Sequence, residues 1–153
     1  MILITIAIST AVGAKRDRVW RALTDPQELL RWDERLIAAI DPMDGYPRAG
    51  RLVRWRYRLG SVPVVLEDHP LEVVPGERLR SQLGFGHLRF DGIWTLCDES
   101  QNGARTRLAL RMVASNAVPL VGGLLDRFGV REIAAELADA RLRQVAKWCE
   151  THP

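Results

Sequence analysis

The segment at residues 19–32 constrains the fold of this chain more than any other feature of its sequence. Its apolar residues form two short runs on either side of a Thr-Asp-Pro step, and each run is spaced to give one inward-facing helical side. Either Thr24 or Asp25 can cap a second helix, and Pro26 fits its first turn, where a missing N–H costs nothing. The segment therefore predicts two short helices directly behind an apolar run at residues 2–10.

The middle of the chain alternates apolar and polar residues, as half-buried strands do, and its turns are short. The turn at residues 101–103 contains the Asn-Gly pair that favours a tight hairpin. Together with the N-terminal run, these stretches predict an antiparallel meander of six to seven strands. We expect the strands at residues 2–10, 36–43, 51–59, 62–74, 78–85, 87–97 and 104–114.

The last third of the chain changes to a spacing near 3.6 residues, which predicts a long amphipathic helix over about residues 119–150. Gly122, Gly123 and Gly129 weaken its first part, so we expect a kink or a separate segment near Gly129. One face of this helix must pack on the apolar face of the sheet, because neither can bury itself alone. We expect a single α+β domain over residues 1–153.

The composition argues against several classes of function. The 22 basic and 19 acidic residues give a net charge of +3, and the basic residues are spread along the chain rather than clustered, so no nucleic-acid partner is expected. Cys97 and Cys149 form no disulfide framework, which favours reduced thiols in the cytoplasm. No apolar run is long enough to span a membrane, and the first run lacks the preceding basic residue of a signal peptide.

No metal or cofactor motif is present in the sequence. The histidines and cysteines show no ligand spacing, and no glycine-rich phosphate loop or nucleophile elbow appears. We expect no metal and no cofactor. Asp33 and Glu34 are interpreted as solvated charges, and His87 and His152 as surface residues.

The order of elements, and three stretches within them, resemble a known superfamily. These stretches are the V-W-x-A-L-T-D-P-x-x-L-x-x-W pattern from Val19 to Trp32, the run at residues 72–79, and Trp94-Thr95-Leu96 followed by residues 103–106. They resemble the START-like superfamily, often labelled SRPBCC, which includes polyketide cyclase/dehydrase and lipid-transport proteins and birch-pollen-allergen-like proteins. The resemblance implies a helix-grip fold, in which a curved antiparallel sheet wraps the C-terminal helix around a hydrophobic cavity.

A cavity of that kind needs an apolar lining, and the sequence offers an aromatic and aliphatic set for it. The same set could instead be a filled core, and the pattern alone does not separate the two. Trp and Tyr add a polar group that could orient a ligand. The candidate ligand-binding residues are Trp32, Trp55, Tyr57, Phe85, Phe90, Trp94, Leu110, Met112, Leu124 and Phe128.

His69, Glu67 and Tyr57 are the candidate catalytic residues. If Leu71 and Val73 face inward, strict alternation also turns His69 and Glu67 inward, where a His beside a carboxylate could act as a general acid or base. A bulge at Pro70 would instead turn His69 to solvent.

Three functions are consistent with these features. The first is binding of a small hydrophobic ligand, lipid- or polyketide-like, in the cavity. The second is a cyclase/dehydratase-like enzyme that works without metal, and the third is a protein-interaction module resembling heat-shock ATPase activators. An open apolar tunnel would favour binding or catalysis, and a polar, sealed core would favour the interaction module. An exposed strand edge also offers a route to a homodimer.

Overall fold

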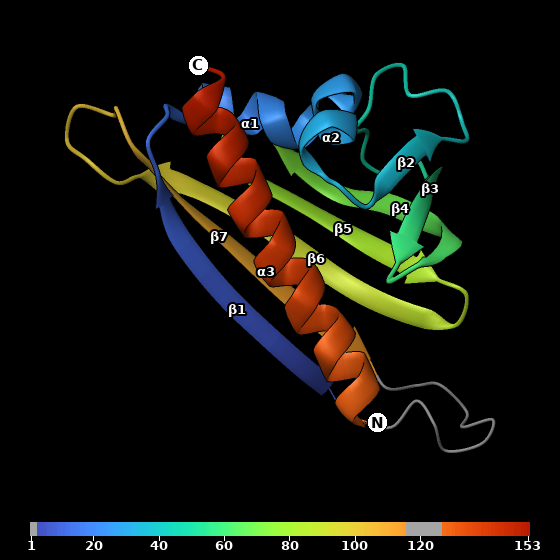
Figure 1. Ribbon diagram of the computed structural model, residues 1–153. Helices are drawn as coiled ribbons and strands as arrows, with labels where there is room; N and C mark the ends of the chain where they lie inside the picture. The colour runs from blue at the N-terminus through green and yellow to red at the C-terminus, as the bar shows by residue number, and fades with distance from the viewer. Residues whose placement is uncertain (1–2, 116–126) are drawn as a thin grey trace.

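The computed structural model describes residues 3–115 and 127–153 of the chain. Seven strands form one antiparallel sheet in the order β1-β7-β6-β5-β4-β3-β2. The strands are β1 (Leu3–Val12), β2 (Leu36–Ala39), β3 (Val53–Leu59), β4 (Val62–Val74), β5 (Arg78–Phe85), β6 (Leu88–Asp98) and β7 (Thr106–Ser115). The long helix α3 (Arg127–Thr151) crosses the concave face of this sheet and packs mainly on β1 and β7 (Figure 1).

Two short helices follow β1 and cover one end of the concave face (Figure 1). They are α1 (Arg16–Thr24) and α2 (Pro26–Trp32). The cap of α2 is Asp25, because its side chain accepts a hydrogen bond from the backbone N–H of Gln27 at 2.9 Å, while Thr24 donates to a carbonyl of its own helix. The break predicted at this step is confirmed.

The α+β helix-grip architecture predicted from the sequence is confirmed, with differences at the edges of elements. The strand expected over residues 36–43 ends at Ala39. Helix α3 is continuous from Arg127 through Gly129, and the expected helical start at residues 119–126, with Gly122 and Gly123, lies outside the described residues.

The register of β4 changes near its middle, and this change decides which side chains face α3. Asp68 pairs with Val53 and Leu83, whose side chains are buried on the inner face. The pairing with β5 then shifts between Pro70 and Glu72, which inserts one extra residue as a bulge. The residues of β4 before the bulge therefore keep Leu66, Asp68 and Pro70 inside.

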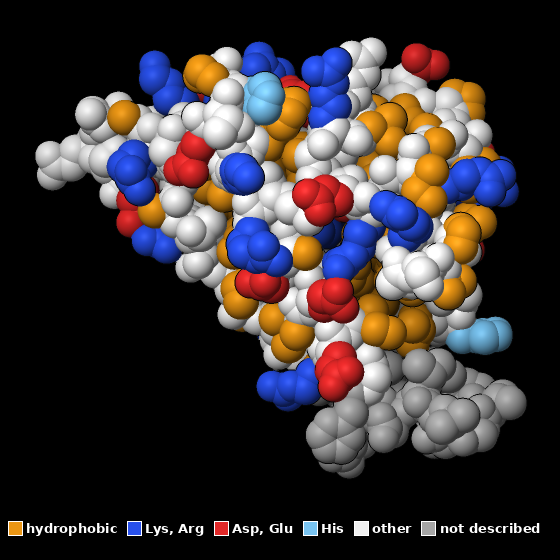
Figure 2. All heavy atoms as spheres, viewed as in Figure 1, with side chains coloured by type: hydrophobic (Ala, Val, Ile, Leu, Met, Phe, Trp, Pro, Cys, Tyr) orange, Lys and Arg blue, Asp and Glu red, His pale blue; other side chains and the backbone are white. Residues whose placement is uncertain are grey.

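The core lies between the inner face of the sheet and the three helices. Its largest fully buried side chains include Trp55, Tyr57, Phe90, Leu108 and Met112. The opposite side of α3 is exposed and carries both acidic and basic side chains (Figure 2). Within the described part of the chain, no helix is long and apolar enough to cross a membrane.

Candidate functional site

A small cavity of about 30 Å³ lies between the sheet and α3. That volume accommodates about one water molecule. Its lining is mixed, with apolar side chains from the sheet and α1, a carboxylate, a guanidinium and a phenol. The lining residues are Leu23, Tyr46, Asp68, Leu79, Ser81, Leu83, Gly92, Trp94, Leu110, Met112 and Arg141.

Asp68 places a carboxylate at this cavity from the inner face of β4, and it is only 5% exposed. Its Oδ2 accepts hydrogen bonds from the Tyr46 hydroxyl at 2.6 Å and from Nε1 of Trp55 at 3.3 Å. Its Oδ1 has no hydrogen-bond partner among the described residues. Burial raises the pKa of Asp68, although the Tyr46 hydroxyl, the charge of Arg141, and the side chains of Trp55 and Ser81 act in the opposite direction.

Arg141 brings a positive charge to the same cavity from α3. Its guanidinium lies between two indole rings, 5.5 Å from the ring centre of Trp32 and 5.7 Å from that of Trp94, within the range of cation–π attraction. Nε of Arg141 is 3.4 Å from Oδ2 of Asp33, yet this nitrogen completes no hydrogen bond within the described structure. Burial lowers the pKa of Arg141, but the nearby acidic groups, Asp33 first, outweigh this effect and raise it.

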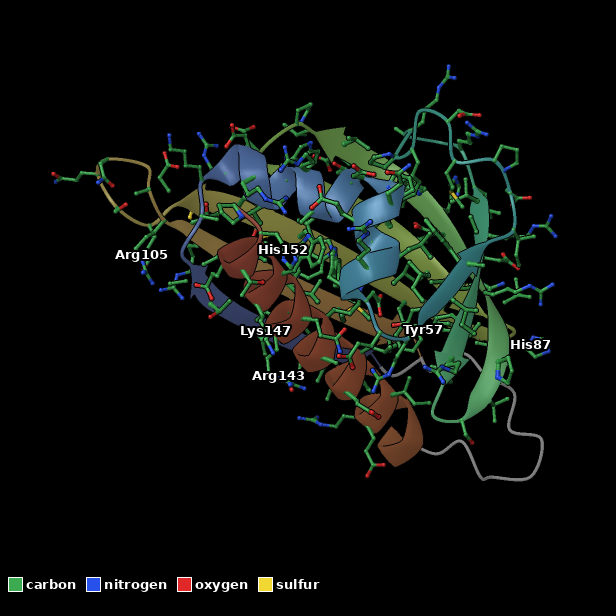
Figure 3. All side chains as sticks on the ribbon, turned by 45° about the horizontal axis from the view of Figure 1, so that its top comes forward. Tyr57, His87, Arg105, Arg143, Lys147 and His152 are labelled. Carbon is green, nitrogen blue, oxygen red and sulfur yellow. The ribbon has the colours of Figure 1, made fainter. Side chains whose placement is uncertain are left out.

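Asp33 and Tyr57 extend the cluster toward the β3–β4 hairpin. Asp33 ends α2 and is only 2% exposed, so burial raises its pKa while Arg141 opposes that shift. Asp33 Oδ1 accepts a hydrogen bond from the backbone N–H of Arg35 at 3.1 Å. Tyr57 points from β3 into the interior toward α3 (Figure 3), and burial together with the charge of Asp33 raises its pKa. Its buried hydroxyl also lacks a hydrogen-bond partner among the described residues.

A second hollow of about 260 Å³ lies beside α3, between this helix and the β3–β4 hairpin, and opens to solvent. Leu59 and Gly60 of the hairpin and Ile133 and Leu137 of α3 form its apolar part. An ion pair between Arg35 and Glu136 lies at its edge. Hydrophobic side chains are visible on this side of α3 in Figure 2.

One stripe of α3 joins the hollow to the cavity. Ile133, Leu137 and Arg141 are spaced by four residues, which places them on one side of the helix. Ile133 and Leu137 line the hollow, and Arg141 lines the cavity. At a rise of about 1.5 Å per residue, the two spaces lie roughly two helical turns apart or less.

A wider hollow of about 810 Å³ occupies the opposite face of the sheet, across β1, β7, β6, β5 and β4. Its charged groups are largely paired with one another, Arg80 with Asp91 at 2.8 Å and Arg78 with Glu72 at 2.7 Å. These are partly exposed pairs of the kind that stabilise a surface weakly. We therefore place the candidate site at the cavity on the inner face.

The predicted ligand-binding residues divide into three groups. Trp94, Leu110 and Met112 line the cavity. The side chains of Trp32, Trp55, Tyr57, Phe85 and Phe90 are buried in the core around it without lining it. Leu124 and the side chain of Phe128 lie outside the described residues.

The predicted catalytic residues His69 and Glu67 do not face the cavity. They pair with Gln82 and Arg54, which are exposed on the outer face of the sheet. The assumption that Val73 and His69 share a face was wrong, because Val73 pairs with the buried Leu79 and the bulge after Pro70 interrupts the alternation. His69 and Glu67 therefore drop out as catalytic candidates, and Tyr57 remains on the inner face.

The residues predicted from the sequence did not include Asp68, Tyr46 or Arg141. The interpretation of Asp33 as a solvated charge was wrong, because this residue is 2% exposed. Two signals were available. Asp68 alternates with the apolar residues Leu66 and Pro70, and Arg141 interrupts an apolar stripe of α3. A charged residue at an apolar position of a periodic pattern marks a buried charge, which natural proteins retain for a specific purpose.

Solved structures with the same architecture include proteins of different descriptions. The aromatase/cyclase Zhui from Streptomyces sp. R1128 has a TM-score of 0.77 and 17% identity, over 97% of this chain and 94% of its own. A START superfamily protein from Mycobacterium smegmatis has a TM-score of 0.76 and 12% identity, and the match covers 97% of this chain and 99% of that protein. Protein CV1439 from Chromobacterium violaceum has a TM-score of 0.71 and 22% identity, over 95% and 97%. At these identities the likeness shows the fold alone.

No protein of curated function matches the sequence. The family model described as polyketide cyclase/dehydrase and lipid transport matches residues 4–150, nearly the whole chain. The helix-grip fold agrees with this match, and the chain belongs to the polyketide cyclase/dehydrase and lipid-transport family.

Proposed function

We propose that this protein binds a small, mainly apolar molecule between the sheet and α3, and holds an oxygen-bearing group of that molecule at Asp68 and Arg141. The observation that carries the proposal is a buried oxygen of the cavity lining, Asp68 Oδ1, which has no hydrogen-bond partner among the described residues. A buried polar atom without a partner costs about 1–3 kcal/mol. A ligand hydroxyl in the cavity would give this oxygen a partner.

The size of the cavity limits which part of the ligand it can hold. About 30 Å³ has room for a hydroxyl or carbonyl group and not for a ring system or an acyl chain. The body of the ligand belongs in the hollow of about 260 Å³ beside α3, which has an apolar lining. Leu137 lines the hollow and lies about one helical turn from Arg141, which lines the cavity.

The protein-interaction module is the first alternative, and the small polar cavity is the feature that favours it. A sealed polar core with a purely structural role is expected to satisfy its own hydrogen bonds, because partly satisfied buried networks are costly. Here Tyr57, Asp68 and Arg141 each keep an unpaired atom within the described structure. This incompleteness favours a ligand site over a sealed structural core.

A cyclase/dehydratase-like enzyme is the second candidate, and one observation supports it. Asp68 has a raised pKa and receives a short hydrogen bond from Tyr46, so the pair could give or take a proton at a carbonyl group in the cavity. Arg141 would stabilise negative charge that develops on that oxygen. On this proposal Asp68 and Tyr46 take the place that the sequence analysis gave to His69 and Glu67.

Native mass spectrometry of freshly purified protein tests the binding proposal directly, through the mass of any co-purified small molecule. Thermal unfolding with added naphthol supplies a second test, since a ligand that binds only the native state raises Tm. A hundred-fold excess over Kd adds about 2.7 kcal/mol to the free energy of unfolding. We expect naphthol to raise Tm.

Gly92→Ala supplies the matched variant, because Gly92 lines the cavity and an added Cβ would lie 3.4 Å from the sulfur of Met112. The extra methyl narrows the cavity without a clash and should weaken naphthol binding. Ile93→Val changes the neighbouring residue of β6, which faces the outer hollow, and should leave binding unchanged. Absence of a Tm shift with millimolar naphthol, or equal binding by wild type and Gly92→Ala, would contradict the proposal.

A further inference from the structure

The charges around the cavity are unequal in number. Asp68 and Arg141 line the cavity, and Asp33 lies 3.4 Å from Nε of Arg141, so two carboxylates share this guanidinium. Arg35 also acts on Asp33, but its own charge is paired with Glu136 at the edge of the hollow. Tyr46 and Tyr57 add hydroxyls that stay neutral, because burial and the neighbouring carboxylates raise their pKa values. With both carboxylates ionised, the cluster of Asp33, Asp68 and Arg141 has a net negative charge. With one carboxylate protonated, its net charge is zero.

The guanidinium is also already engaged. Oδ2 of Asp33 lies 3.4 Å from Nε of Arg141, and the rings of Trp32 and Trp94 flank the guanidinium carbon. These neighbours balance its charge within the protein. An anionic ligand at Arg141 would compete with Asp33 for this charge, and Asp33 is 2% exposed and cannot turn to water.

The open position at the cavity belongs to Asp68. Tyr46 and Trp55 both donate to Oδ2, which leaves Oδ1 facing the cavity without a partner among the described residues. An ionised carboxylate accepts hydrogen bonds and repels a second anion in a site that excludes water. A protonated one can donate to a neutral oxygen as well.

From this arrangement we infer that the cavity selects a neutral ligand with a hydroxyl or carbonyl group and rejects the corresponding carboxylate. The inference rests on the proposed binding function and adds the chemical class of the group that is held. A phenol or alcohol O–H donates to Asp68 Oδ1, and a carbonyl oxygen accepts from the protonated acid or from Arg141. A carboxylate head places a third negative charge beside Asp33 and Asp68.

Naphthol and naphthoate, substituted at the same ring position, test this selectivity, and naphthalene reports the contribution of the rings alone. Calorimetric titration at neutral pH measures Kd for each compound. We expect naphthol to bind at least ten-fold more tightly than naphthoate and more tightly than naphthalene. Ten-fold corresponds to about 1.4 kcal/mol.

Asp68→Asn identifies the source of the selectivity. The amide keeps a carbonyl oxygen for Tyr46 and Trp55 while it removes one buried negative charge. We expect the naphthol-to-naphthoate preference to fall by ten-fold or more in this variant. Asp91→Asn is the matched control, because it removes the same charge from the ion pair with Arg80 on the outer face and should preserve the preference.

The outcomes separate the inference from the binding proposal. If naphthoate binds as tightly as naphthol, or if Asp68→Asn and Asp91→Asn change the preference equally, the selectivity inference is overturned while binding stands. If neither compound nor naphthalene binds to the folded wild-type protein, the binding proposal fails and the inference fails with it. A far-ultraviolet circular dichroism spectrum and a Tm for each variant establish that the proteins compared are folded.

Discussion

Replacing Arg141 with methionine should destabilise the protein strongly, although this residue is charged and lies on an amphipathic helix. Arg141→Met keeps an unbranched side chain on α3 but removes the cation that faces Asp33 at 3.4 Å. Asp33 is 2% exposed and cannot recover its hydration by a side-chain rotation. Removal of one partner from a buried ion pair costs about 3–5 kcal/mol.

That loss is large compared with the stability of a domain. Domains of this kind have free energies of unfolding of about 5–15 kcal/mol, so the variant keeps only part of the total. At about 2–4 °C per kcal/mol for a chain of this size, Tm should fall by roughly 6–20 °C. Met also gives up the cation–π contacts with Trp32 and Trp94, which adds to the loss.

A double-mutant cycle isolates the pair. Asp33→Asn should cost less than Arg141→Met, about 1–3 kcal/mol, because Arg141 keeps 17% of its side chain exposed and has Asp68 nearby. In the double variant Asp33→Asn, Arg141→Met, residue 33 is uncharged, so the loss of the Arg141 cation leaves no buried carboxylate without a partner. The double variant should therefore be more stable than the sum of the single effects predicts, by about 0.5–3 kcal/mol.

The destabilisation of Arg141→Met should also depend on pH. Burial already raises the pKa of Asp33, and loss of the opposing Arg141 charge raises it further. With a raised native pKa, the native state holds a proton that the unfolded chain has released, so stability falls as pH rises from about 3.9 toward the native value. The difference from wild type should be largest at neutral pH and should shrink as the solution is acidified.

Urea unfolding followed by tryptophan fluorescence and circular dichroism measures these free energies, with a constant m value as the check on two-state behaviour. A loss below about 1 kcal/mol for Arg141→Met at neutral pH would refute the argument that Asp33 depends on this cation. Strict additivity in the cycle would refute it as well. Arg143→Met is the matched control, because Arg143 pairs with Asp139 on the exposed side of α3 and should change stability by less than about 0.5 kcal/mol.

Three further outcomes follow from particular contacts. Glu28→Gln should destabilise the protein by about 1–3 kcal/mol in urea unfolding, because it removes the charge that pairs with Arg18 at 2.8 Å and with Arg21 at 3.1 Å. Burial opposes ionisation of Glu28, but its partners hold its pKa below the usual value. The stabilisation that Glu28 provides should therefore be present above about pH 4.3 and be lost as pH falls through the native pKa. A loss of stability in Glu28→Gln that is equal at all pH values would contradict this. Leu108→Ala should cost about 2–5 kcal/mol, since this side chain is fully buried, and Val65→Ala, at a site 45% exposed, should cost far less in the same assay. His69→Ala should leave the naphthol Kd unchanged in calorimetry, because its side chain lies on the outer face; a ten-fold weaker Kd would return His69 to the site.

The sequence by itself determined the elements and most of their order. The break at Asp25-Pro26 is local chemistry, since the cap and the proline act within one helical turn. The strands β3 to β7 and the helix α3 follow from periods of two and about 3.6, which a single segment carries without reference to its neighbours. Mutual burial predicted that the helix packs on the apolar face of the sheet, and the resemblance to the START-like superfamily implied the helix-grip arrangement.

Only the tertiary structure decided the face of β4 and the content of the cavity. A single bulge after Pro70 reverses which residues face inward, and its position depends on pairing with β5 rather than on β4 alone. Asp68 thereby faces α3, and His69 does not. The space left under α3 is the small difference between the volume that the sheet and helices enclose and the summed volume of the side chains that fill it. The amino-acid sequence alone therefore could not predict a cavity of about 30 Å³ rather than an open tunnel. Asp33, Asp68 and Arg141 come from α2, β4 and α3, and their shared burial exists only after these three elements pack together.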